Sequence, residues 1–237
     1  MASAVRESII TPLRPMSDAD HTSSSPDSET GETPPAARKR PKPGERRVQI
    51  LQALASMLEQ PGAERITTAA LAAKLDVSEA ALYRHFASKA QMFEGLIEFI
   101  EQTVFSLINQ IAEREGPATD AASGARQASK VVAMLIQFAE KNPGMTRVMV
   151  GDALVFENER LQQRMNQFFD KIESTLKQCL RDGAQAVPTT SATPSVDAQV
   201  RASVLTAFVA GRLQRFARSG FRRLPSEHLE ASLALIL

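Results

Sequence analysis

The sequence lacks most of the residue types that build catalytic and metal centres. Among its 237 residues there are three histidines, one cysteine and no tryptophan. The histidines His21, His85 and His228 lie far apart, and the sequence has neither a glycine-rich phosphate loop nor a Gly-x-Ser-x-Gly turn. We therefore expect no enzyme activity, no cofactor and no metal. The lone Cys179 cannot form an internal disulfide, and its place on an apolar helical stripe predicts a buried structural thiol in a reducing cytoplasm.

Long apolar runs are also missing. The longest, residues 131–139, is too short to cross a bilayer, and no basic segment followed by an apolar stretch opens the chain. We expect neither export nor a membrane partner. The hydrophobic content of 43% still allows a sizeable core, and apolar residues recur at spacings of three and four without strand-like alternation. This pattern predicts an all-α fold.

The net charge of +1 hides an uneven distribution. Residues 1–44 are rich in Ser, Thr, Pro and acids and lack apolar periodicity, which predicts a disordered tail. Six basic residues and one acid, Glu45, lie between Arg38 and Arg47. This segment, which includes Arg46, is either ordinary solvated charge or an arm that contacts DNA phosphates or the minor groove.

Helix signals divide the rest of the chain into a head, residues 45–88, and a body, residues 89–237. A first helix through residues 50–58 should end at the Pro61-Gly62 breaker, and Thr67 or Thr68 and Ser78 can cap two short helices. A fourth helix should begin at Ser88 with a Ser-x-x-Gln capping box and run to about residue 114. Further helices are expected at about 125–141, 143–157, 158–182, 197–219 and 226–236, with a loop over 188–194.

Residues 66–86 carry the most informative pattern. A short amphipathic helix, a tight turn and a second short helix predict a helix-turn-helix that binds duplex DNA. Its apolar side chains, expected to pack inward, are Leu71, Leu75, Val77, Leu82 and Phe86. The side chains expected to face the DNA are Thr67, Thr68, Ser78, Glu79, Ala80, Tyr83, Arg84 and His85.

These outward groups suit contacts to phosphates and base edges. Thr67 and Thr68 lie at a helix N-terminus, where a hydroxyl and free amides can hold a phosphate. Ala80 can touch a thymine methyl group, and Lys89 could hold another phosphate. Taken singly, Tyr83 could equally cover the core of the domain, His85 could be a capped surface imidazole, and Arg84 could be an ordinary surface charge.

Two apolar stripes in the body have two interpretations, an internal core or a dimer interface built from two helices of each subunit. We favour the dimer because one helix-turn-helix contacts too few base pairs to be selective. The first stripe comprises Leu161, Met165, Phe168, Ile172, Leu176 and Cys179. The second comprises Val204, Leu205, Phe208 and Phe216 around Gly211.

The run Leu82-Tyr83-Arg84-His85-Phe86, followed by Ser88-Lys89 and Met92-Phe93, resembles the N-terminal domain of the TetR family. The resemblance implies an all-helical homodimer with a small DNA-binding head and a larger body. Asp76 departs from the glycine usual at the turn, but Asp tolerates the left-handed conformation.

Within that family, residues 45–237 resemble the nucleoid occlusion factors. The motifs that carry this likeness are residues 77–86, 96–101 and 142–144, with Leu161-Gln162 and Asn166-Gln167. The resemblance implies a cytoplasmic, nucleoid-associated protein that binds palindromic double-stranded DNA sites as a homodimer or a dimer of dimers. When bound, such proteins antagonise polymerisation of the division protein FtsZ, so that no septum forms over the nucleoid.

A partner site follows from the same resemblance. Phe99 lies about 110° from the centre of its helix's apolar stripe, which predicts partial exposure, although such a ring can also pack on a neighbouring helix. With Met134, Lys141 and Asn142 it matches the groove that binds the FtsZ tail, whereas Leu107 departs from the basic residue expected there.

The alternative function is that of an ordinary TetR-like repressor whose body binds a small-molecule inducer. The scarcity of aromatic residues, with one Tyr and no Trp, weakly disfavours a dedicated inducer pocket. A pure assembly protein that does not bind DNA would leave the outward polar residues of the head unexplained.

Overall fold

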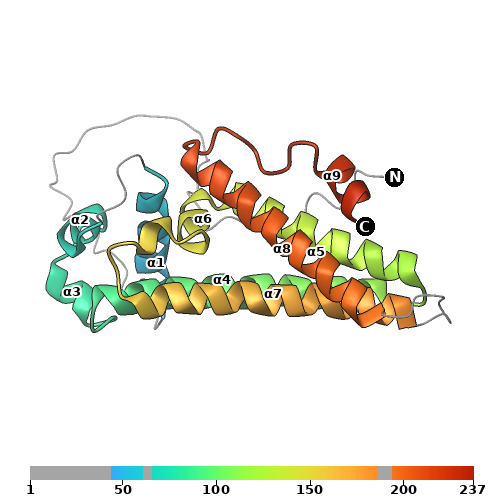
Figure 1. Ribbon diagram of the computed structural model, residues 1–237. Coiled ribbons are helices and arrows are strands. Elements are labelled where there is room, and N and C mark those ends of the chain that lie inside the picture. Colours follow the sequence, from blue (N-terminus) through green and yellow to red (C-terminus); the bar gives the residue numbers. More distant parts are fainter. Residues whose placement is uncertain (1–43, 61–65, 186–193) are drawn as a thin grey trace, which may run out of the picture.

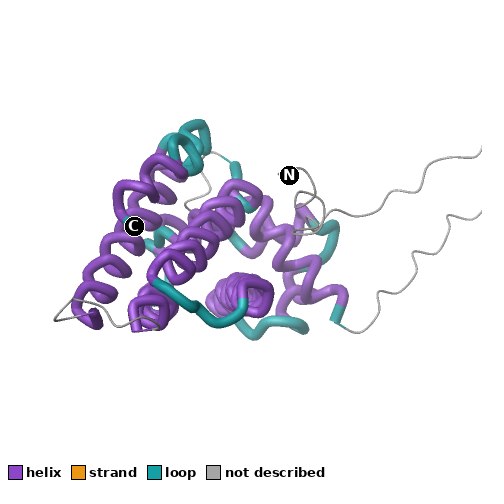
Figure 2. The backbone as a smooth tube through the Cα atoms, turned by 90° about the vertical axis from the view of Figure 1, so that its right-hand side faces the viewer, coloured by secondary structure: helices purple, strands orange, loops and turns teal. Residues whose placement is uncertain are grey.

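The computed structural model describes residues 44–60, 66–185 and 194–237. The predicted tail up to residue 43, the Pro61-Gly62 breaker and the loop up to residue 193 lie outside these residues. The described chain is all-α and contains no strand, which confirms the predicted fold class (Figures 1 and 2). No helix in it is long and apolar enough to span a membrane. The elements are α1 (Glu45–Leu58), α2 (Thr68–Lys74), α3 (Glu79–Tyr83), α4 (Lys89–Glu115), α5 (Ala121–Lys141), α6 (Pro143–Met149), η2 (Asp152–Leu154), α7 (Glu159–Gln185), α8 (Pro194–Arg218) and α9 (Leu229–Ile236).

Side-chain caps define the starts of three helices, as predicted. The hydroxyl oxygens of Thr67, Ser78 and Ser88 each accept a hydrogen bond from the amide three residues further on. One detail differs from the expected capping box of α4. The Gln91 side chain accepts from the amide of Ala87 at 2.9 Å, one residue before the cap.

The start of α5 was predicted four residues too late. Asp120 and Ser123 form a reciprocal capping box in which Ser123 N donates to Asp120 Oδ1 at 2.7 Å and Asp120 N donates to Ser123 Oγ at 3.0 Å. The bond from the Ser123 amide to the carboxylate, with the Ser123 side chain beside it, lowers the pKa of Asp120. This box initiates the helix ahead of its first buried aliphatic residues.

The expected helix over 143–157 is wrong beyond Met149. Gly151 adopts a left-handed conformation, with φ of 82°, and one 3-10 turn follows it. The last helix begins at Leu229 rather than near 226, because His228 is also left-handed.

The helices form a small head, α1–α3, at one end of an elongated body (Figure 1). Helices α4 and α7 run side by side along the body, and α5 and α8 pack against α7. A Cβ atom at Gly124 of α5 would lie 2.5 Å from the Cys179 carbonyl oxygen, and one at Gly183 of α7 would lie 2.6 Å from the Asp120 carbonyl oxygen. Only glycine permits so close an approach of two helices.

The first apolar stripe belongs to the core of a single chain. Its members from Leu161 to Leu176 are all buried by other helices of the same molecule, and Cys179 is half-buried, so the interpretation of this stripe as a dimer interface is wrong. The second stripe is divided, because Leu205 and Phe216 are buried whereas Val204 is 46% exposed. The exposed apolar face of α8 consists of Val196, Val200 and Val204.

Candidate nucleic-acid interface and partner face

The turn between α2 and α3 is built as a helix-turn-helix requires. Asp76 adopts a left-handed conformation with φ of 53°, as expected at this position, and the Val77 amide donates to the Ala72 carbonyl at 3.0 Å. Leu71 and Leu82 are buried beneath the two short helices, so the relative orientation of α2 and α3 is fixed.

Helix α3 presents the predicted contact residues to solvent. Tyr83 is 45% exposed, and Arg84 and His85 are exposed beside it. Ser78 and Ala80 at the start of the helix are also exposed. The face therefore offers a phenol, a guanidinium and an imidazole next to small side chains, which permits close approach to a polyanion.

The two threonines of α2 have different environments. Thr67 is exposed, and its oxygen accepts from the Ala70 amide at 3.1 Å, which leaves the hydroxyl proton available for a phosphate. Thr68 is half-buried and donates to the Glu79 carboxylate at 2.5 Å. The Thr68–Glu79 pair thus joins α2 to α3, a positioning role that the sequence pattern did not reveal.

Arg47 is engaged within the head. Its guanidinium lies 4.2 Å from the centre of the Phe86 ring, and Nη1 donates to the His85 carbonyl at 3.1 Å. These contacts tie α1 to the segment that follows α3. Arg46, by contrast, is half-buried, and its side chain makes no hydrogen bond or ion pair with another described residue.

Lys89 also makes an internal contact. Its ammonium group lies 2.5 Å from the Glu157 carboxylate and 5.7 Å from the centre of the Phe93 ring. The residue predicted to hold a phosphate therefore forms an ion pair between the start of α4 and the segment before α7.

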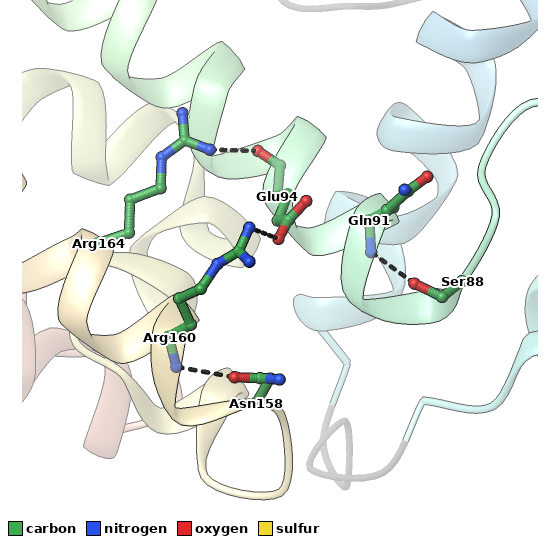
Figure 3. A network of polar contacts seen from close by, with 6 residues as sticks. All are labelled: Ser88, Gln91, Glu94, Asn158, Arg160 and Arg164. Carbon is green, nitrogen blue, oxygen red and sulfur yellow. Dashed lines mark hydrogen bonds and ion pairs between the residues drawn. The ribbon is translucent and has the colours of Figure 1, made fainter.

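Two further ion pairs continue this connection along α4, and Figure 3 shows the one between Arg160 and Glu94. Arg160 binds Glu94 at 2.9 Å, and Arg164 binds Glu101 at 2.7 Å. Arg164 also donates to the Glu94 carbonyl at 3.5 Å. We call these two pairs, together with Lys89–Glu157, the ionic ladder. The ionic ladder joins α4, the helix that follows the head, to α7 and the segment before it.

The four residues of the predicted partner face differ in accessibility. Phe99 is half-buried and packs against the core, and Met134 is only 8% exposed. Lys141 is exposed at the end of α5, whereas the Asn142 side chain donates to the Phe138 carbonyl at 2.8 Å. Lys141 is thus the most accessible of the four, and Met134 supports the face from within.

The described residues contain no group of His, Cys, Asp and Glu side chains that could hold a metal. The Cys179 thiol is half-buried, and this burial, together with the Asp182 carboxylate, raises its pKa. A neutral thiol is a poor nucleophile, in keeping with a structural role.

Comparison with known proteins identifies both parts of the chain. The profile for bacterial regulatory proteins of the tetR family matches residues 50–96, and an SlmA-like profile described as a tetracyclin repressor-like C-terminal domain matches residues 125–237. The nucleoid occlusion factor SlmA of Idiomarina loihiensis is 50% identical over 186 residues, which cover 78% of this chain and 90% of that protein. Its counterpart in Vibrio cholerae is 50% identical over 192 residues, covering 81% and 93%.

Solved structures show the same fold at low sequence identity. The transcriptional regulator FadR of Bacillus subtilis, in complex with stearoyl-CoA, aligns with a TM-score of 0.62 and 14% identity over 80% of this chain and 96% of its own. NalD of Pseudomonas aeruginosa, a secondary repressor of a multidrug efflux pump, aligns with a TM-score of 0.58 and 19% identity over 81% and 94%.

Proposed function

Given that this chain belongs to the family of the nucleoid occlusion factor SlmA, with the fold of TetR-type regulators, we propose that it binds chromosomal DNA sites as a dimer and there opposes FtsZ assembly. The family assignment confirms the resemblance predicted from residues 66–93 and from the motifs of the body. The observation that carries the proposal is the exposed Tyr83-Arg84-His85 face on a TetR-type head.

The structure divides the eleven predicted DNA-binding residues into two groups. In the proposal, the contact residues are the exposed Ala80, through its methyl group, and six residues whose polar side chains are exposed or unengaged: Arg46, Thr67, Ser78, Tyr83, Arg84 and His85. The others hold α3, the proposed recognition helix, in place through internal contacts: Arg47, Thr68, Glu79 and Lys89. Exposed hydroxyls and cations next to an alanine methyl suit phosphate anchoring and major-groove contacts.

Dimerisation is proposed through the exposed side of α8. Val196, Val200 and Val204 form an apolar row at helical spacing, and a surface hollow of about 680 Å³ between α7 and α8 continues it past Gly211. The row is solvent-exposed in a single chain, so burying it against a second copy would contribute hydrophobic free energy. Two heads presented by one dimer would match a palindromic site.

For FtsZ, we propose the surface beside Phe99 and Lys141, with Asn142 and the buried Met134 shaping it. The exposed Lys141 offers a cation to a peptide, and the half-buried Phe99 ring offers apolar area at the edge of the core. A few anchor side chains commonly supply most of the binding energy of an interface.

Sedimentation of FtsZ polymers tests the proposal. We expect the protein to reduce the pelleted FtsZ fraction, and to do so more strongly when duplex containing its specific site is added. The Phe99→Ala and Lys141→Glu variants should retain DNA binding but lose this effect. Full inhibition by both variants would reject the partner face, and a wild-type protein without effect on FtsZ would reject the partner.

Chromosome-wide occupancy separates this function from that of an ordinary repressor. Many dispersed binding sites are expected for nucleoid occlusion. A single site beside the protein's own gene, released by a small molecule, would instead support the repressor alternative.

A further inference from the structure

The second half of α8 and the segment after it contain basic residues without acids. Between Asp197 and Glu227 the chain has six arginines and neither Asp nor Glu. Four of them lie within nine residues at the C-terminal end of α8 and just beyond it: Arg215, Arg218, Arg222 and Arg223, all exposed. We call these four residues the arginine patch.

A fixed backbone turn presents the last two of these arginines. The Ser219 hydroxyl oxygen accepts from the amides of Arg222 and Arg223 at 3.1 and 2.9 Å. Gly220 and Phe221 are both left-handed, with φ of 62° and 63°, a conformation that is costly for an aromatic residue. The turn therefore places the backbone of both arginines outside the helix, and Arg222 Nε also donates to the Ser219 carbonyl at 2.9 Å.

The turn is also anchored from below. The Phe221 ring meets the buried Phe216 ring edge-on at 5.1 Å, and the guanidinium of Arg147 from α6 lies 5.2 Å from the centre of the Phe221 ring. The Nε atom of Arg147 is buried and makes no hydrogen bond among the described residues. A fifth positive charge thus lies beneath the patch.

No carboxylate of the described residues forms an ion pair with any of these five arginines. The acid closest along the chain is Glu227, whose carboxylate lies 3.9 Å from the His228 imidazole. Arg222, Arg223, Leu224, Ser226 and Glu227 line a surface hollow of about 620 Å³. Two acids lie at this hollow, because Glu227 is part of its lining and the Ser226 amide donates to the Glu140 carboxylate at 2.9 Å. The four arginines of the patch outnumber these acids, and such an excess of positive charge attracts an acidic chain.

From this complementarity we infer that the arginine patch binds the acidic segment of the chain's own N-terminal region, residues 18–32. That segment contains Asp18, Asp20, Asp27, Glu29 and Glu32 and has no Lys or Arg. It lies outside both family profiles, which cover residues 50–96 and 125–237. The interaction would therefore be an addition of this chain to the shared fold.

The linking chain is long enough for this contact. Glu32 precedes Gly44, the N-cap of α1, by twelve residues, which reach about 40 Å when fully extended. Helix α1 is about 20 Å long and packs on α6, where a Cβ atom at Gly144 would lie 2.0 Å from the Ala55 carbonyl oxygen. Helix α6 in turn lies beside the end of α8 (Figure 1). The path from Gly44 to the arginine patch thus runs along α1 and across α6.

Binding there would hold the acids away from the basic segment that follows them. Residues 38–47 carry six positive charges, and the last two of these, Arg46 and Arg47, belong to α1 of the head. Because acids free to pair with this segment would compete with DNA phosphates, the arginine patch separates the two oppositely charged parts of the tail.

Arginine-selective modification of the full-length protein tests the inference. The probe is phenylglyoxal in low-salt buffer without DNA, and mass spectrometry gives a rate for each arginine. The wild type is compared with a variant in which the five acids of residues 18–32 are replaced by Asn or Gln. Since each exposed ion pair is weak, two simultaneous pairs should protect the patch about fivefold.

We expect the rates at Arg222 and Arg223 to rise by that factor in the amide variant, and also in wild type at high salt, where screening is strong. The exposed Arg126 of α5 is the matched control and should react equally in both proteins. Equal rates at Arg222 and Arg223 in the two proteins would overturn the inference. This holds even if added duplex DNA protects both arginines, because the patch would then bind DNA and not the acidic segment. A change confined to Arg38 and Arg40 would also overturn it, because the acids would then pair within the tail.

Discussion

Arg47 offers a test of whether a cation near the DNA acts by contacting phosphate or by holding the head together. Its stacking on Phe86 and its bond to the His85 carbonyl connect α1 to the end of the recognition helix. Arg47→Met removes the charge and both contacts, whereas Arg47→Lys keeps the charge but loses the planar group that stacks. Arg46→Lys is the matched control, because the neighbouring Arg46 makes no such contact.

The geometry sets the expected magnitude. A guanidinium over an aromatic ring at an exposed site contributes about 0.5–1 kcal/mol, and a charged donor bonded to a carbonyl adds about 1 kcal/mol after solvent screening. Arg47→Met should therefore destabilise the fold by about 1–2 kcal/mol. For a chain of this size, each kcal/mol lowers the midpoint of thermal unfolding by about 2–4 °C.

Thermal unfolding and DNA affinity measured over a range of salt concentrations together distinguish the two roles. A positioning role predicts a lower unfolding midpoint and weaker DNA binding, with an unchanged slope of log affinity against log salt, in both Arg47 variants. Loss of one phosphate contact lowers that slope by about 0.9. If Arg47→Met reduces the slope by that amount and unfolds at the wild-type temperature, Arg47 is a phosphate ligand and the positioning argument fails.

Three other predictions concern the head, the body and the cap of α5. Arg84→Ala and Thr67→Ala should each weaken operator binding, by roughly 1–3 kcal/mol for a base contact and less for a phosphate contact, while sedimentation still gives a dimer; unchanged affinity in both would remove the assigned face. Gly144→Ala should lower the urea midpoint, by about 1–3 kcal/mol of overpacking, because the new methyl group would lie 2.0 Å from the Ala55 carbonyl oxygen; a wild-type midpoint would contradict this close approach. Because its pKa is lowered in the folded state, Asp120 stabilises the fold at pH values above the usual carboxyl range, and this contribution disappears as the pH falls through the folded-state pKa. Asp120→Asn should therefore reduce the loss of unfolding free energy at acid pH. An identical loss in the variant would exclude the cap as its cause.

The helical head was predictable because its signals are local. Hydroxyl caps at Thr67, Ser78 and Ser88 each act on an amide three residues away, and the left-handed turn at Asp76 follows from the short side chain of that residue. Apolar spacing then fixed which sides of α2 and α3 are buried.

Contacts between distant segments were not predictable in the same way. Arg47 and Lys89 carry charges that suit DNA phosphates. Only the tertiary structure shows that Arg47 stacks on Phe86 and that Lys89 forms an ion pair with Glu157. The apolar stripe of α7 illustrates the same limit, because helical periodicity shows that a face is buried but not whether its own chain or a second copy covers it. Helix α6 is shorter than predicted because Gly151 adopts a left-handed conformation, although the helical apolar pattern continues beyond it.

The position of Phe99 relative to the ionic ladder has a thermodynamic consequence. Phe99 lies on α4 between Glu94 and Glu101, the two acids that arginines of α7 hold, so a peptide bound there touches the same helix that orients the head. If operator DNA raises the affinity of that surface for a division protein by some factor, the division protein must raise the affinity for the operator by the same factor. The assembling division machinery would then prolong the residence of its own inhibitor on the chromosome.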